Sequence, residues 1–473
     1  MKSSLMVKSV VLAMVLAMVA SMAAFAVPIS VEVQSIFKFS RSSQEGVLPF
    51  TSFSNTHEFR FRASDSGKWT LHLDTAASGA ILQWNAPKFR AQLIATPVTF
   101  DVWGGGYDLG AASVNTDPAA LIVMGSAAMR PFAFGGMTNN VAAGQAKVRS
   151  TFKVADANIA AVVHYLNNQR TYLEAYGDYN LDAATIGGIV RAGIDADEDL
   201  NTTAVVGFVK TEVGGVNIGG SAGARFGDSI DGDNVAFGIV ADTKLQDGAL
   251  VLQGEYVNRQ KNFYDDLAHD AGYQNGTERF RNAYSSAADG KGEANLIRFT
   301  GTWLGEANKT RPLHNVLHAT DYAVLTNLKG PAFQAIVQRT KDVSEEPELK
   351  LVARAGTRFL ENNLWAVGEL NMWKDENGVG SIAGVAGKDT RYQLRGVARY
   401  NLNDVGWNNW FLVGKFDYSS TSDGDETGST RSLTGELWYE SGKVRIVNGF
   451  TSAKASNADK PTNTISAEFR LKF

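Results

Sequence analysis

Alternation of apolar and polar side chains with a period of two recurs from about residue 147 to the last residue, and it limits this chain to a fold built from strands. The final ten residues, TISAEFRLKF, show the pattern most clearly. Along an extended strand their two faces hold Ile465, Ala467, Phe469, Leu471 and Phe473 on one side, and Thr464, Ser466, Glu468, Arg470 and Lys472 on the other. Turns rich in Gly, Asn and Asp separate successive segments, which predicts serial antiparallel strands.

A soluble sandwich produces the same alternation, so the length of the segments has to distinguish the two environments. Residues 173–181, 349–359 and 391–402 are close to the ~9–11 residues that a tilted strand needs to cross a bilayer, whereas soluble strands average ~5–6. Aromatic residues also end the apolar faces, as Tyr392 and Tyr400 do, where a bilayer interface would place them. The sequence therefore favours a closed membrane barrel, and a soluble secreted sheet is the alternative.

The N-terminal segment predicts export. Lys2 and Lys8 precede an apolar run that closes on Ala24-Phe25-Ala26, which is typical of a secretory signal peptide cleaved after Ala26. An uncleaved anchor helix is the alternative, since the run is nearly long enough to span. After residue 26 no apolar stretch approaches the ~20 residues of a membrane helix, so any later crossing must use strands.

Composition excludes several other classes of protein. Cysteine is absent, which excludes a disulfide scaffold and thiol chemistry in an exported chain. Without Lys2 and Lys8, the 43 basic and 49 acidic side chains give a net charge of −6, and nothing in this balance points to nucleic acid.

A signal peptide, serial amphipathic strands, no cysteine and a last strand ending in Phe473 together resemble the Gram-negative outer-membrane β-barrels, and the porins most of all. The resemblance implies one transmembrane antiparallel up-and-down β-barrel over residues 27–473, located in the cell outer membrane. It also implies that the barrel assembly machinery recognises the strand Thr464–Phe473. The partners it implies are outer-membrane lipid, lipopolysaccharide and two further copies in a homotrimer.

The strand number follows from length and parity. About 20 residues per strand predict about 22 strands, with a range of 18 to 24, and the total must be even. Short connections are expected at 182–184, 244–248, 360–363 and 440–442, and long ones at 227–233, 260–293, 375–389, 419–430 and 452–462. This alternation of short and long connections fails by one strand between residues 294 and 347. Residues 57–103 fit either four strands or six.

If the apolar faces meet lipid, the charged faces line the pore, because a basic side chain at mid-membrane costs ~2–4 kcal/mol on the lipid side. The residues expected to line it are Arg391, Arg395, Arg399, Lys350, Arg354, Arg358, Glu369, Glu174 and Asp178. Two basic ladders would then face Glu174 and Asp178 across the lumen, as in the general porins that the chain resembles, and set up a transverse field. The alternative is that these charges only keep the lumen hydrated, and Lys147, Arg149 and Lys153 complicate a two-sided picture.

Two long segments are candidates for a loop that narrows the pore. Residues 104–146 are rich in Gly and Ala and are the preferred constriction; residues 260–293, with Asp265, Asp266, Arg279 and Arg281, are the second candidate. Acidic clusters at 195–199, 228–233 and 423–426 have the hard oxygen ligands of Ca²⁺ or Mg²⁺, but solvated loop charge explains them better.

Catalytic signals are weak. His164 falls on a polar face without a serine partner at a recognisable spacing, and Gly104 to Gly106 lack the following Lys of a phosphate loop. We therefore expect no enzyme, no cofactor and no bound metal.

The leading hypothesis is a passive diffusion channel for ions and small polar solutes. A substrate-specific channel, for example for sugars, is the alternative within transport, with Tyr176 and Trp365 as lumen-facing aromatics. A structural barrel that anchors the envelope or presents loops is the alternative from another class.

Overall fold

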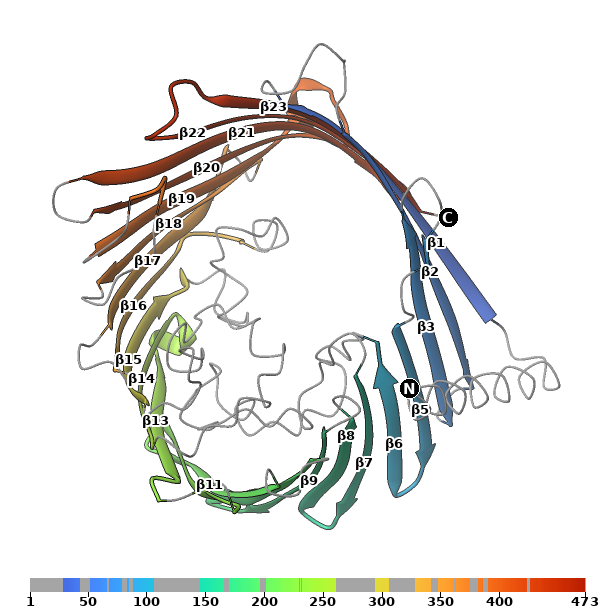
Figure 1. The fold of residues 1–473 in the computed structure, drawn as a ribbon, viewed down its shortest axis with the longest axis vertical. Helices are drawn as coiled ribbons and strands as arrows, with labels where there is room; N and C mark the ends of the chain where they lie inside the picture. Colours follow the sequence, from blue (N-terminus) through green and yellow to red (C-terminus); the bar gives the residue numbers. More distant parts are fainter. Residues whose placement is uncertain are drawn as a thin grey trace.

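The chain forms a closed antiparallel β-barrel, described here from a computed structural model. The structure describes residues 29–42, 52–65, 68–78, 83–84, 88–105, 145–165, 170–195, 201–228, 230, 232–260, 294–305, 328–341, 348–360, 363–374, 382–385, 390–422 and 426–472. Each strand pairs with the next along the chain, and β1 pairs with β23, so the sheet has no free edge. Figure 1 shows β1 beside β23 where the ring closes.

Twenty-two strands make the wall, which confirms the predicted up-and-down barrel and its expected strand number. A two-residue strand, β4 (Gln83–Trp84), pairs with the end of β3 only. The wall strands are β1 (Ile29–Ser42), β2 (Ser52–Asp65), β3 (Trp69–Ser78), β5 (Lys88–Ala95), β6 (Val98–Gly104), β7 (Ala146–Val154), β8 (Ala157–Tyr165), β9 (Arg170–Leu181), β10 (Ala184–Asp195), β11 (Thr202–Val213), β12 (Val216–Phe226), β13 (Val235–Leu245), β14 (Leu250–Arg259), β15 (Ala294–Trp303), β16 (Ala332–Lys341), β17 (Glu348–Phe359), β18 (Leu364–Lys374), β19 (Thr390–Asn401), β20 (Trp410–Ser422), β21 (Thr427–Ser441), β22 (Val444–Ala455) and β23 (Thr462–Lys472).

The two ends of the barrel differ in their connections. The turn end carries the tight hairpins, such as Gly214 and Gly215 between β11 and β12, where φ values of 59° and 80° fit a two-residue turn that requires a left-handed backbone. The loop end carries most of the longer connections. The short connections expected near 182–184, 244–248, 360–363 and 440–442 all lie at the turn end.

Three expectations about the strands are settled by this arrangement. No wall strand is missing between 294 and 347, because β15 and β16 pair directly with each other; they are joined at the turn end by a long connection over 304–331, where a short one was assumed. Residues 57–103 contribute four wall strands rather than six. The connections expected at 419–430 and 452–462 are shorter than predicted. β20 ends at residue 422 and β21 begins at 427, and β22 ends at residue 455 and β23 begins at 462.

The loop segments 106–144 and 261–293, which hold nearly all of both candidate constrictions, lie outside the described residues, as do the predicted signal peptide 1–26 and Phe473. In the described part of the chain, no helix is long and apolar enough to cross a membrane.

An apolar cluster lies inside the barrel near the turn end. It consists of Val251, Leu304, Leu328, Ala332, Trp365, Val367, Val397, Val413 and Trp438. Leu328, next to the start of β16, is completely buried in it and approaches Gly356 of β17. A side-chain carbon on Gly356 would lie 2.9 Å from Leu328 Cδ1, so the glycine makes room for this leucine.

Candidate functional site

The two faces of the wall differ sharply in chemistry and in exposure. Leu394 and Phe450 are 45% and 49% exposed, whereas Arg354 and Glu369 are 5% and 4% exposed. Because side chains converge on the concave side of a closed sheet and diverge on the convex side, the buried charged face is the inner one. Residues opposite each other in the strand register share a face, so this assignment extends around the barrel.

Aromatic rings mark both limits of the outer apolar band. At the turn end, Trp410 of β20 packs against Trp407 and Tyr439, with ring centroids 6.0 Å and 5.2 Å apart. Toward the loop end, Tyr392 and Tyr418 face outward on β19 and β20. This is the distribution that an aromatic girdle at each bilayer interface requires.

A row of polar and charged side chains crosses β16 to β20 on the inner face. Arg354 of β17 stands between Gln334 and Glu369, and its guanidinium donates to both, at 2.8 Å from Nη1 to Gln334 Oε1 and 2.7 Å from Nε to Glu369 Oε2. Arg395 continues the row, 3.9 Å from Glu369 and 2.9 Å from Asp417. The charges alternate in sign along the row, so each arginine has an acid on a neighbouring strand.

The other predicted basic residues pack on aromatic rings of the same wall. Trp373 lies between Lys350 and Arg391, whose charged groups are 5.5 Å and 5.6 Å from its ring centre. Arg358 lies 4.7 Å from the ring centre of Trp365. These distances suit cation–π attraction, which holds the cations against the wall.

Arg399 combines both kinds of contact. Its guanidinium lies 3.8 Å from the ring centre of Phe411 and 3.3 Å from Glu440. Glu440 also forms an ion pair with Arg445, whose Nε lies 3.4 Å from its carboxylate. Arg399 is therefore held by the wall rather than extended from it.

The other two predicted acidic residues, Glu174 and Asp178, lie on the inner face of β9, and they too have local partners. Glu174 is 3.7 Å from Arg191 of β10, and both side chains are buried. Asp178 accepts from Asn158 at 2.8 Å and from the Tyr176 hydroxyl. The nearby Arg149, which complicated the two-sided picture, pairs with Asp101 of β6 at 3.5 Å.

All nine residues expected to line the pore thus lie on the inner face, and the structure joins them to partners that the sequence did not reveal. Those partners are Gln334, Asp417, Glu440, Arg191 and Asn158. Asp417 shares the inner face with Arg395, but their pairing depends on the register between β19 and β20, which alternation along a single strand does not supply. Arg354, Arg395, Arg399 and Glu174 thus have partners of opposite charge on the wall, and a transverse field between a basic and an acidic wall stays a prediction.

His164 lies on the inner face as expected. It is 1% exposed, its Nε2 lies 3.2 Å from Gln145 Oε1, and its ring tilts against Tyr172. Among the described residues, no group of three potential metal ligands is close enough to hold an ion. Of the acidic clusters at 195–199, 228–233 and 423–426, the structure describes only Asp195, Asp228, Asp233 and Glu426, and the other acids lie outside the described residues.

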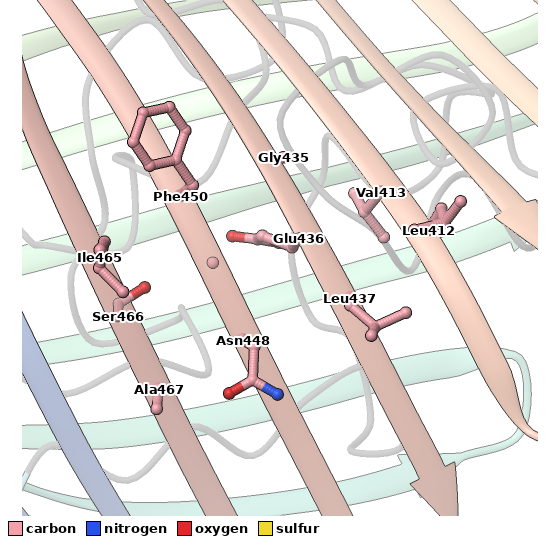
Figure 2. A pocket seen from close by; sticks show the side chains of 11 residues that line it. Leu412, Val413, Gly435, Glu436, Leu437, Asn448, Phe450, Ile465, Ser466 and Ala467 are labelled. Atoms are coloured by element: carbon pink, nitrogen blue, oxygen red, sulfur yellow. The ribbon is translucent and has the colours of Figure 1, made fainter.

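A hollow of 520 Å³ opens in the wall of β20 to β23. Figure 2 shows Leu412, Leu437, Phe450 and Ile465 around the position of Gly435, which has no side chain to fill the space. These are outer-face residues, so the hollow belongs to the apolar surface of the barrel and not to its charged interior.

No family model matches the chain, and no curated protein matches it. Among solved structures, the chain is similar over 94% of its length to the P pilus usher (PapC) translocation pore, at 9% identity, with a TM-score of 0.41 and 99% of that chain covered. It is similar over 95% of its length to Pseudomonas aeruginosa OpdQ, at 9% identity and a TM-score of 0.39, with 98% of that chain covered. A third similar structure is Pseudomonas aeruginosa OccK2 (OpdF) in complex with glucuronate, at 8% identity and a TM-score of 0.35, over 94% of this chain and 98% of that one. Similarities at this level carry no argument about function, which has to come from the barrel itself.

Proposed function

We propose that this chain is a passive, water-filled diffusion channel of the outer membrane for ions and small polar solutes. One observation carries the proposal: the closed barrel has an apolar outer face between its two aromatic girdles and is lined by charged and polar side chains on its inner face. An apolar exterior between two aromatic girdles suits hydrocarbon, and a 22-stranded barrel is wider than its inward side chains can fill.

The inner-wall charges support weak rather than strong ion selectivity. Arg395 and Asp417 are the most accessible members of the charged row, with 32% and 43% of each side chain exposed. Because they lie 2.9 Å apart, a passing ion meets both signs at nearly the same place. Such a wall keeps water ordered and admits ions of either sign, with a preference set by whichever charge is unbalanced.

Recording from planar bilayers tests the proposal. The purified, folded protein is expected to give stable conductance steps at low protein concentration. A folded protein that inserts and never produces steps would contradict a channel of any kind.

Arg395→Gln is expected to shift the preference of the channel toward cations, because it leaves Asp417 unbalanced at the water-accessible part of the wall. The measurement is the reversal potential in a KCl gradient. The matched control is Arg431→Gln, which removes a positive charge from the outer face and should leave the reversal potential unchanged. Equal shifts in both variants would mean that Arg395 does not face the conducting path.

The described aromatics do not favour a sugar-specific channel. Tyr176 is 3% exposed and stacks on Phe208 at 6.0 Å, and Trp365 is 8% exposed and covered by Arg358. Rings buried in this way offer no continuous surface for a sugar. Recognition of the last strand by the assembly machinery and a homotrimeric state stay predictions.

A further inference from the structure

The outer face of the barrel carries charges of one sign at the loop end. Five basic residues face outward near that end: Arg41, Arg339, Lys374, Arg431 and Lys454. They belong to β1, β16, β18, β21 and β22, which lie within the part of the wall that runs from β16 through β23 to β1. We call them the loop-end basic band. No acidic side chain faces outward at this end in the strands that the structure describes.

Arg431 and Lys454 are the strongest feature of this band, because they lie directly opposite each other on β21 and β22. Like charges at such positions destabilise a sheet unless something compensates for them. Lys454 Nζ donates to the main-chain carbonyl of Asp459, at 3.3 Å, and not to a carboxylate. Arg431 is exposed and has no ion pair within the described part of the chain.

The height of Arg431 and Lys454 along the barrel indicates which group compensates for their like charges. Tyr418 is the register partner of Arg431 on β20, and Leu433 follows two residues along β21 on the same outer face. Lys374 lies two residues beyond Met372, the partner of Tyr392. The basic band therefore begins where the aromatic rings end the apolar surface, which is the level of lipid headgroups.

We propose that the loop-end basic band binds the phosphate groups of lipids in the leaflet on the loop side, a site that rests on the proposed membrane channel. The Arg431 guanidinium offers a planar fork of donors to a phosphate, and Lys454 adds a second positive charge beside it. A second copy of this chain is a poorer occupant. The acid described on the outer face is Asp65, which lies at the turn end and pairs with Lys68 at 3.2 Å.

Retention of lipopolysaccharide tests the site. The full-length protein is reconstituted into phosphatidylcholine vesicles that contain lipopolysaccharide, and the lipopolysaccharide retained per barrel is measured after exchange into neutral detergent. Arg431→Gln/Lys454→Gln is expected to weaken retention about 25-fold, since each basic side chain near an anionic surface changes binding roughly fivefold. The matched control is Lys68→Gln/Lys443→Gln, which removes two exposed lysines from the turn end and should leave the retention of lipopolysaccharide unchanged.

The outcomes separate this inference from the channel proposal. Equal retention of lipopolysaccharide by both double variants, in barrels that still conduct, would overturn lipid binding by the loop-end basic band. It would leave the proposed channel function unaffected. A parent protein that does not insert into vesicles would overturn both. Binding of inorganic phosphate to the parent barrel in neutral detergent that is lost in the double variant, together with equal lipopolysaccharide retention by parent and double variant, would show a site for free phosphate and not for lipid. If the double variant does not fold, each single variant is expected to show about a fivefold loss, and no loss in either would overturn the site.

Discussion

At the scale of single residues, Arg354 and Glu369 depend on each other. Both side chains are almost wholly buried, and their 2.7 Å contact is completed by Gln334 and by Asn371, which donates to Glu369 at 2.6 Å. Removing one member of a buried pair leaves an uncompensated charge, whereas removing both does not. This pair therefore matters for assembly of the wall as well as for its charge.

Arg354→Leu is expected to destabilise the barrel by roughly 3 kcal/mol, and Arg354→Leu/Glu369→Leu by much less. Folded fractions in urea, followed by the heat-modifiable mobility of the barrel on gels, provide the measurement. Lys38→Gln is the control, because the pair of Lys38 with Glu468 is largely exposed on the lysine side and should contribute less than about 1 kcal/mol. If the double variant is no more stable than Arg354→Leu, the two charges are not coupled.

At the scale of strands, the two faces set opposite demands on small residues. Gly435 of β21 faces outward, and nothing lies within 4 Å of where its side chain would begin. Gly356 of β17 faces inward, where the same carbon would lie 2.7 Å from Val367 and 2.9 Å from Leu328. One glycine leaves a surface hollow, and the other makes close packing possible.

Gly435→Val is expected to raise stability slightly, by about 0.5 kcal/mol, because valine suits a strand better than glycine does and finds open space. Gly356→Val is expected to lower stability by about 2 kcal/mol through overpacking. The same urea titration compares the two. A loss of stability in both variants would show that no open space surrounds the position of Gly435.

Strand faces were predictable from the sequence because a period of two fixes them without knowledge of neighbours. Arg391, Arg395 and Arg399 could therefore be placed on one face from their spacing alone. Their partners could not, because pairing of Arg395 with Asp417 needs the register of two strands. The strand count failed at 304–331 because connection length was taken to show which end of the barrel a connection occupies.

At the scale of the whole molecule, closure depends on β1 and β23. Their register runs from Gln34 opposite Lys472 to Ser42 opposite Thr464, and inner-face pairs reinforce it, with Lys38 3.2 Å from Glu468 and Lys472 3.0 Å from Glu32. Closure removes the exposed edge that an open sheet of this size would present, and it separates an inside from an outside.

Nitroxide labels at single cysteines introduced one at a time along residues 391–400 of β19 test that separation most directly, and the absence of native cysteine makes each label unique. In the reconstituted protein, labels at odd positions, Arg395 among them, should be relaxed by a water-soluble nickel complex, except at Val397, which lies in the buried apolar cluster. Labels at even positions, Leu394 among them, should be relaxed by oxygen dissolved in the bilayer. Equal accessibility at both sets, or the opposite alternation, would contradict a barrel that holds water inside and hydrocarbon outside.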